Sequence, residues 1–170
     1  GFPKAADIPL QPWAKALVEA RNEHYGIDSP LVDCKASPGP AFFNAPGFEI
    51  TEVPEMKSIF IMNMAGPHSW RQIFMDGRQH PKDLRPTFLG HSIGHWEGDT
   101  LVVDSVGFNE KQWAFGAYPN TNQMHIIEKF TRPDLKTITY EATLDDPGAY
   151  TKPWTVKWTI TEKTLSKWLD

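Results

Sequence analysis

The chain has 170 residues and a net charge of −4; 40% of its residues are hydrophobic and 22% are charged. This length predicts a single domain over residues 1–170, and this composition excludes a disordered or fibrous chain. Lys and Arg are scattered and no apolar run approaches the ~18 residues of a membrane helix, so we expect neither a nucleic-acid partner nor a membrane span.

The predicted elements begin with one helix at about 10–25. Pro12 suits a first helical turn, and apolar residues recur with helical spacing from Trp13 to Ala20. A Pro-rich loop is predicted at 29–46, because this stretch contains four prolines and few periodic positions.

From residue 47 onward the hydrophobic pattern has a period of two, which is typical of β-strands. Short turn-forming segments separate eight such stretches, so we expect successive strands to pair antiparallel. The pattern predicts a mainly β fold, an antiparallel eight-stranded calycin-like or lipocalin-like barrel after one N-terminal helix, with a β-sandwich as the alternative. The predicted strands are 48–53, 57–64, 69–75, 88–96, 100–107, 123–131, 137–144 and 154–161.

One carboxylate falls on an apolar strand face. Alternation in the strand at 123–131 puts Glu128 on the same face as Met124, Ile126 and Phe130. Burial among these side chains would raise the pKa of Glu128 toward the range useful for general acid or base catalysis. The alternative is a structural Glu128 that pairs with an Arg or Lys across the barrel.

Two histidines and a carboxylate share one predicted hairpin. If Gly98-Asp99 is its two-residue loop, His95 lies opposite Val102, and His91 and Asp104 lie on the same sheet face as His95. Such a group suits proton transfer, since Asp fixes the tautomer of a neighbouring His. If that face is external, the three residues form a solvated polar stripe. Our candidate catalytic residues are therefore His91, His95, Asp104 and Glu128.

A barrel of this size encloses side chains or one small ligand. We expect aromatic side chains to bind such a ligand, with Arg71 anchoring an anionic group or, alternatively, forming a surface salt bridge. The aromatic residues at 109–122 suit either a lid over the barrel or packing against the helix. The candidate substrate-binding residues are Phe60, Trp70, Arg71, Tyr140, Trp154 and Trp158.

We expect no cofactor and no metal. The sequence contains no GxGxxG, P-loop, GxSxG or HExxH motif, and its single cysteine is Cys34. On one strand His91 and His95 would lie about 13 Å apart, too far to share an ion. A set such as His91 with Asp104 and His125 stays open.

Several segments resemble a family of uncharacterised bacterial proteins that are common in acidobacterial and environmental genomes. The resemblance covers most of the chain and rests on LQPWA at 10–14, RQIFMDGR at 71–78, WEGDTLVV at 96–103, DP at 146–147 and YTKPWT at 150–155. Members are generally exported, which implies a secreted or periplasmic location, although this sequence contains no signal peptide.

These features favour an enzyme that acts on a small apolar or aromatic molecule inside the barrel by general acid–base chemistry, as a lyase, isomerase, cyclase or hydrolase. A non-catalytic carrier of a hydrophobic ligand is one alternative, and a subunit of an extracellular assembly is another. The sequence does not decide the oligomeric state, and a homo-oligomer is compatible with it.

Overall fold

The computed structural model describes residues 7–24, 27–44, 47–64 and 68–161. Within these ranges the protein is mainly β, and strands occur at all eight predicted places. They are β1 (Phe48–Val53), β2 (Ser58–Asn63), β3 (Trp70–Phe74), β4 (His91–Glu97), β5 (Thr100–Val106), β8 (His125–Asp134), β9 (Thr137–Asp145) and β10 (Trp154–Thr161). A short hairpin, β6 (Trp113–Phe115) and β7 (Tyr118–Pro119), lies between β5 and β8.

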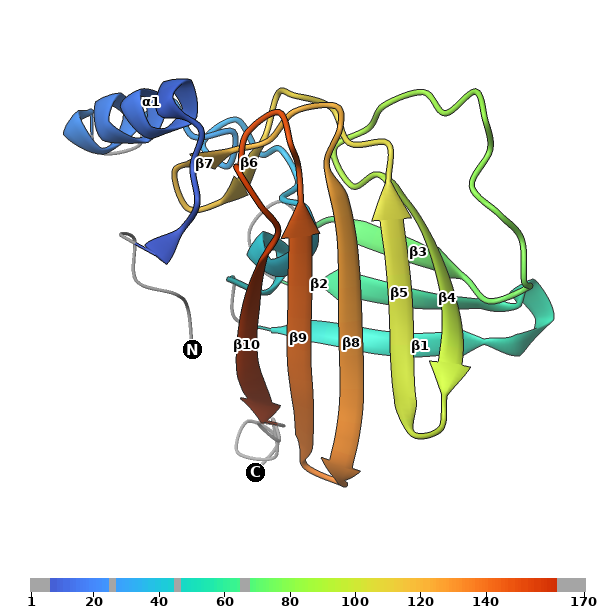
Figure 1. Cartoon of the computed structure of the whole chain (residues 1–170). Coiled ribbons are helices and arrows are strands. Elements are labelled where there is room, and N and C mark those ends of the chain that lie inside the picture. Colours follow the sequence, from blue (N-terminus) through green and yellow to red (C-terminus); the bar gives the residue numbers. More distant parts are fainter. Residues whose placement is uncertain (1–6, 25–26, 45–46, 65–67, 162–170) are drawn as a thin grey trace.

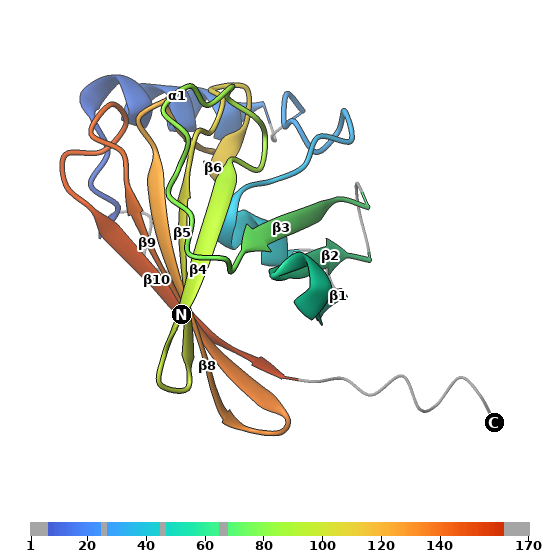
Figure 2. The ribbon, with the colours of Figure 1, turned by 90° about the vertical axis from the view of Figure 1, so that its right-hand side faces the viewer.

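The eight long strands form one curled sheet in the described chain, in the order β1-β2-β3-β4-β5-β8-β9-β10. Figures 1 and 2 show that the sheet curls like half of a barrel, with β1 to β3 crossing over the concave side of β8 to β10. The sheet is mixed rather than antiparallel throughout, because β3 and β4 pair parallel. The prediction of a strictly antiparallel barrel is therefore wrong, while the mainly β class is confirmed.

The parallel pairing follows from the long connection at 75–90. Parallel neighbours require a crossover, whereas antiparallel neighbours need only a tight turn. Figure 1 shows this connection, in green, rising beside β4 and β5 before it enters β4. Thr87 in the connection forms an isolated parallel bridge with Phe108, just after β5. The connection therefore runs close to the two strands that carry His91 and Asp104.

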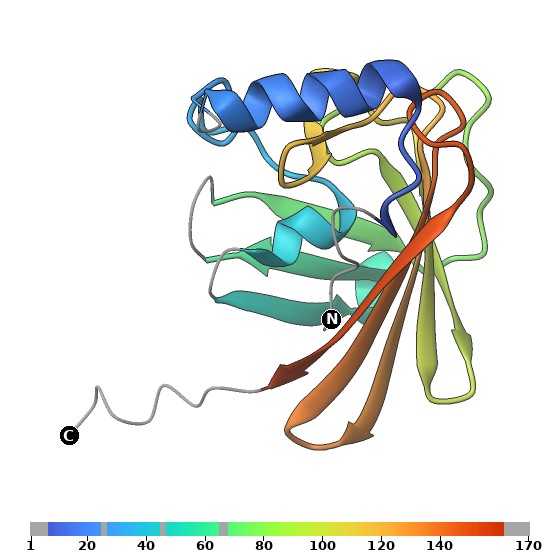
Figure 3. The same cartoon turned by 60° about the vertical axis from the view of Figure 1, so that its left-hand side comes forward.

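The predicted helix is α1 (Pro12–Glu23), which begins at a proline and packs through Ala14 and Val18. Figure 3 shows α1 lying across one end of the curled sheet. The Arg21 guanidinium lies 4.3 Å from the ring centre of Trp113 in β6. Of the two expectations for the aromatic stretch at 109–122, this contact supports packing against the helix. No helix in the described ranges is long and apolar enough to cross a membrane.

Aromatic side chains fill the concave side of the sheet. The 3-10 helix η2 (Gly39–Asn44), within the predicted Pro-rich loop, places Phe42 and Phe43 in this space. The Phe43 ring lies 4.9 Å from the ring centre of Tyr140 and 5.8 Å from that of Phe130. Tyr140 also lies 4.5 Å from Trp158. Side chains of the protein therefore occupy the part of the barrel where we expected a ligand.

Candidate functional site

The β4–β5 hairpin has the predicted register. His91 lies opposite Val106, Ile93 opposite Asp104, and His95 opposite Val102. Successive residues of a strand point to opposite faces, and the buried Ser92 and Ser105 point into the concave side. His91 and Asp104, which directly precede these serines, therefore lie on the outer face of the sheet rather than in the interior.

The outer face brings together three histidines and one carboxylate, which we call the outer cluster: His80, His91, Asp104 and His125. Nδ1 of His80 lies 2.8 Å from Nδ1 of His91, and Nε2 of His80 lies 3.2 Å from Oδ1 of Asp104. Nε2 of His125 in β8 lies 2.8 Å from the same oxygen. The connection at 75–90 supplies His80, so the cluster forms only where this segment returns to the sheet.

The hydrogen bonds determine the tautomers of the neutral rings. The Asp104 carboxylate only accepts, so His80 donates to it from Nε2. A neutral His80 then has an unprotonated Nδ1, which accepts a hydrogen bond from Nδ1 of His91. A neutral His91 in this tautomer has its lone pair on Nε2. The hydrogen bonds thus connect the Asp104 carboxylate to His80 and His80 to His91, and they leave Nε2 of His91 as a basic nitrogen.

The surroundings of His91 keep this ring neutral. Partial burial lowers the pKa of His91 below its ordinary value of 6.5, and electrostatic interactions with the neighbouring His80 and Arg78 lower it further. The ring stacks on Phe74, with ring centres 5.1 Å apart and an interplanar angle of 24°. His91 is therefore unprotonated and held in place at neutral pH, as a general base must be.

A second polar group, which we call the inner cluster, lies directly beneath on the concave side. It consists of Arg71, Ser92, Ser105, Glu128 and Tyr140, all of them buried. Nη1 of Arg71 donates to Oε1 of Glu128 at 3.0 Å, and Nη2 donates to Oε2 of the same carboxylate. The Arg71 guanidinium also donates to both serine hydroxyls, at 3.0 Å from Nε and 2.8 Å from Nη2.

The charged groups of the inner cluster pair with each other, so no charge in this cluster is left without a partner. Burial alone would lower the pKa of Arg71, but the Glu128 carboxylate outweighs burial and raises it. Burial and the Glu128 charge raise the pKa of Tyr140, so this phenol stays neutral and donates to Oε1 of Glu128 at 2.7 Å. Glu128 lies inside as predicted and is fully buried, and its contacts match the structural alternative, a pairing with an Arg across the sheet.

The remaining predicted residues divide between the two faces. Tyr140 and Trp154 are buried in the core, and Trp158 packs against it. Phe60 and Trp70 lie instead on the outer face of β2 and β3, because they alternate with the buried Ile59, Ile61 and Arg71; their ring centres are 5.8 Å apart. His95 is on the outer face as well, 61% exposed and paired with Glu97 rather than with the outer cluster.

Sequence reasoning missed His80 as a site residue and gave His125 only as one member of an open metal set. His80 lies in a connection without periodicity, so no strand pattern could place it. His125 could have been identified from the sequence, because it lies in the predicted strand at 123–131 that also contains Glu128. In the described residues no group of three or more His, Cys, Asp or Glu side chains is arranged to hold a metal ion.

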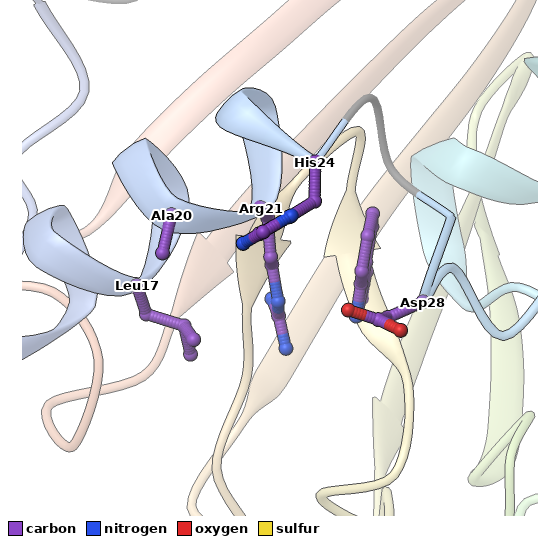
Figure 4. Close-up of a pocket in the computed structure, with 6 residues that line it drawn as sticks. Leu17, Ala20, Arg21, His24 and Asp28 are labelled. Atoms are coloured by element: carbon purple, nitrogen blue, oxygen red, sulfur yellow. The ribbon is translucent and has the colours of Figure 1, made fainter.

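A pocket of about 250 Å³ lies between α1 and β6. Figure 4 shows Leu17, Ala20, Arg21, His24 and Asp28 around it, and Trp113 completes the lining. Arg21 donates from Nη1 to the carbonyl oxygen of Ala117 at 2.9 Å, so this side chain is engaged in packing the helix on the hairpin. The pocket contains none of the site residues predicted from the sequence.

Comparisons of the chain with protein-family models, curated proteins and solved structures found no match. The geometry of the outer cluster is the structural feature of this chain that points to a function.

Proposed function

We propose that the protein is an enzyme that performs general acid–base chemistry on a small apolar or aromatic molecule, with His91 as the base. The observation that carries this proposal is the 2.8 Å contact between Nδ1 of His80 and Nδ1 of His91. Together with the Asp104 carboxylate, this contact leaves a lone pair on Nε2 of His91. The chemistry belongs to a lyase, isomerase, cyclase or hydrolase that needs no redox cofactor.

The proposed step is a proton transfer from the substrate to Nε2 of His91. The electron pair of the broken bond stays on the substrate, and the new imidazolium donates from Nδ1 to His80. Asp104 stabilises this positive charge through His80, so His91 is the catalytic residue and His80 and Asp104 are positioning residues. In an isomerase the same proton returns to another substrate atom, and no co-reactant is required.

The proposal places the chemistry on the outer face because the concave side is filled by the protein's own aromatic side chains. Phe60 and Trp70, farther along the same face, provide apolar surface for a substrate. The family resemblance supports a secreted or periplasmic location for this activity.

We predict that the protein exchanges α-protons of aryl ketones or arylpyruvates for deuterium in D₂O, followed by loss of the proton NMR signal. The rate should rise with pH as His91 loses its proton, with the midpoint of the rise below pH 6.5, because burial lowers the pKa of this base from that value. The His91→Gln variant should lose about two to four orders of magnitude in rate.

The matched control is His24→Gln, which removes an exposed histidine at the end of α1 and should leave the rate unchanged. Failure of every compound in the panel to exchange, or exchange that survives His91→Gln, would contradict the proposed function.

A further inference from the structure

Arg78 lies beside the outer cluster with one edge of its guanidinium held in place. Oδ1 and Oδ2 of Asp76 accept hydrogen bonds from Nε of Arg78 at 2.9 and 3.0 Å, and Oδ2 also accepts one from Nη2 at 2.6 Å. In the described part of the chain Nη1 of Arg78 has no hydrogen-bond partner. Two N–H groups on a fixed, permanently charged group are therefore available to a ligand.

Arg78 and the proposed base His91 are connected through one aromatic side chain, Phe74. The guanidinium carbon lies 3.9 Å from the ring centre of Phe74, and His91 stacks on the same ring. The charge of Arg78 contributes to the lowered pKa of His91, after burial and the interaction with His80. Arg78 and the imidazole that we assign as the base therefore contact the same aromatic ring, and Arg78 is close enough to act electrostatically on His91.

Aromatic side chains also lie farther along this face. Trp70 and Phe74 are on the same face of β3 with Gln72 between them, and Phe60 of β2 packs against Trp70. Trp70 is 59% exposed, so its ring is accessible to a ligand. One cationic anchor beside an aromatic surface matches a molecule that has an anionic end and an apolar body.

We propose that the substrate of this site is a small carboxylate with an aromatic or aliphatic body, and that Arg78 binds its carboxylate through Nη1. This inference rests on the proposed function for the chemical step, but the binding itself is independent of turnover. Arg71, which the sequence suggested for the same role, is buried and already paired with Glu128. Arg78 is thus the residue that determines specificity for an anion.

The test is a titration of the full chain with phenylacetate and with its neutral isostere phenylacetamide, followed by NMR shifts of backbone amides at 74–80 and 91. We expect phenylacetate to bind more tightly than the amide. Arg78→Gln should weaken phenylacetate binding at least about tenfold, the loss expected for a hydrogen bond to a charged group. Arg78→Lys should weaken it less, because the charge remains but the planar fork is lost.

Arg85→Gln is the matched control, since Arg85 is an exposed arginine in the same connection. Equal binding of acid and amide, equal weakening by Arg78→Gln and Arg85→Gln, or no binding of phenylacetate would each overturn the proposal. His91→Gln should still bind phenylacetate. Binding that depends on Arg78 without any α-proton exchange would therefore remove the proposed function while leaving the anion site in place.

Discussion

Replacing Glu128 with Gln is expected to lower the free energy of unfolding by about 3–5 kcal/mol, the cost of breaking a buried ion pair by removing one partner. The Arg71 guanidinium would keep its charge in the core but lose the negative charge and one of the two acceptor oxygens of its partner. The new amide would also turn N–H groups toward an arginine that can only donate. Urea unfolding of the variant measures this loss.

Two further variants show whether the loss comes from the unpaired charge. Glu141→Gln makes the same chemical change in a surface pair with Lys157, where the N–O distance is 3.3 Å, and should cost no more than about 1 kcal/mol. The double variant Arg71→Met with Glu128→Leu removes both charges and should recover much of the lost stability. Full stability of Glu128→Gln combined with a lost exchange rate would contradict the structural role.

Replacing Asp104 with Asn is expected to lower the rate of α-proton exchange by about two to four orders of magnitude. The new amide can donate to Nε2 of His80 and so shift the His80 proton to Nδ1. His80 would then donate to Nδ1 of His91, and the His91 proton would move to Nε2, where the base lone pair is required. The free energy of unfolding should change by no more than about 1–2 kcal/mol, because Asp104 lies outside the core.

The controls for Asp104→Asn lie on the same hairpin. Asp99→Asn makes the same chemical change in the turn and should leave the exchange rate unchanged. His95→Gln should do so too, since His95 pairs with Glu97 at 3.1 Å and not with the outer cluster. A rate that falls with His95→Gln but survives Asp104→Asn would show that the active histidine is not the one supported by His80.

The strands of this protein were predictable because alternation of apolar and polar residues reports directly on sheet faces. The pattern also identified Glu128 as an interior carboxylate and fixed the register of the β4–β5 hairpin, both of which the structure confirms. Alternation tells which residues share a face, but it does not tell which face is concave. Leu101, Val102 and Val103 are all buried, so the hairpin has apolar residues on both sides.

The features of the fold and site that were not predictable depend on segments without hydrophobic periodicity. The connection at 75–90 makes β3 and β4 parallel, supplies His80 to the outer cluster and carries Arg78. Its course over the outer face is decided by a few tertiary contacts, such as the bridge between Thr87 and Phe108, which no local pattern encodes. The filling of the concave side by Phe42 and Phe43 likewise comes from a Pro-rich loop whose path was not predictable.

The tautomer of His91 tests the central claim most directly. Nitrogen-15 NMR of the histidine side chains at neutral pH distinguishes a protonated ring nitrogen from an unprotonated one, without any knowledge of the substrate. We predict that His91 is neutral with its proton on Nδ1 and that His80 has its proton on Nε2, since Asp104 accepts from the latter. A His91 that is protonated on Nε2, or on both nitrogens, would contradict the assignment of this imidazole as a general base.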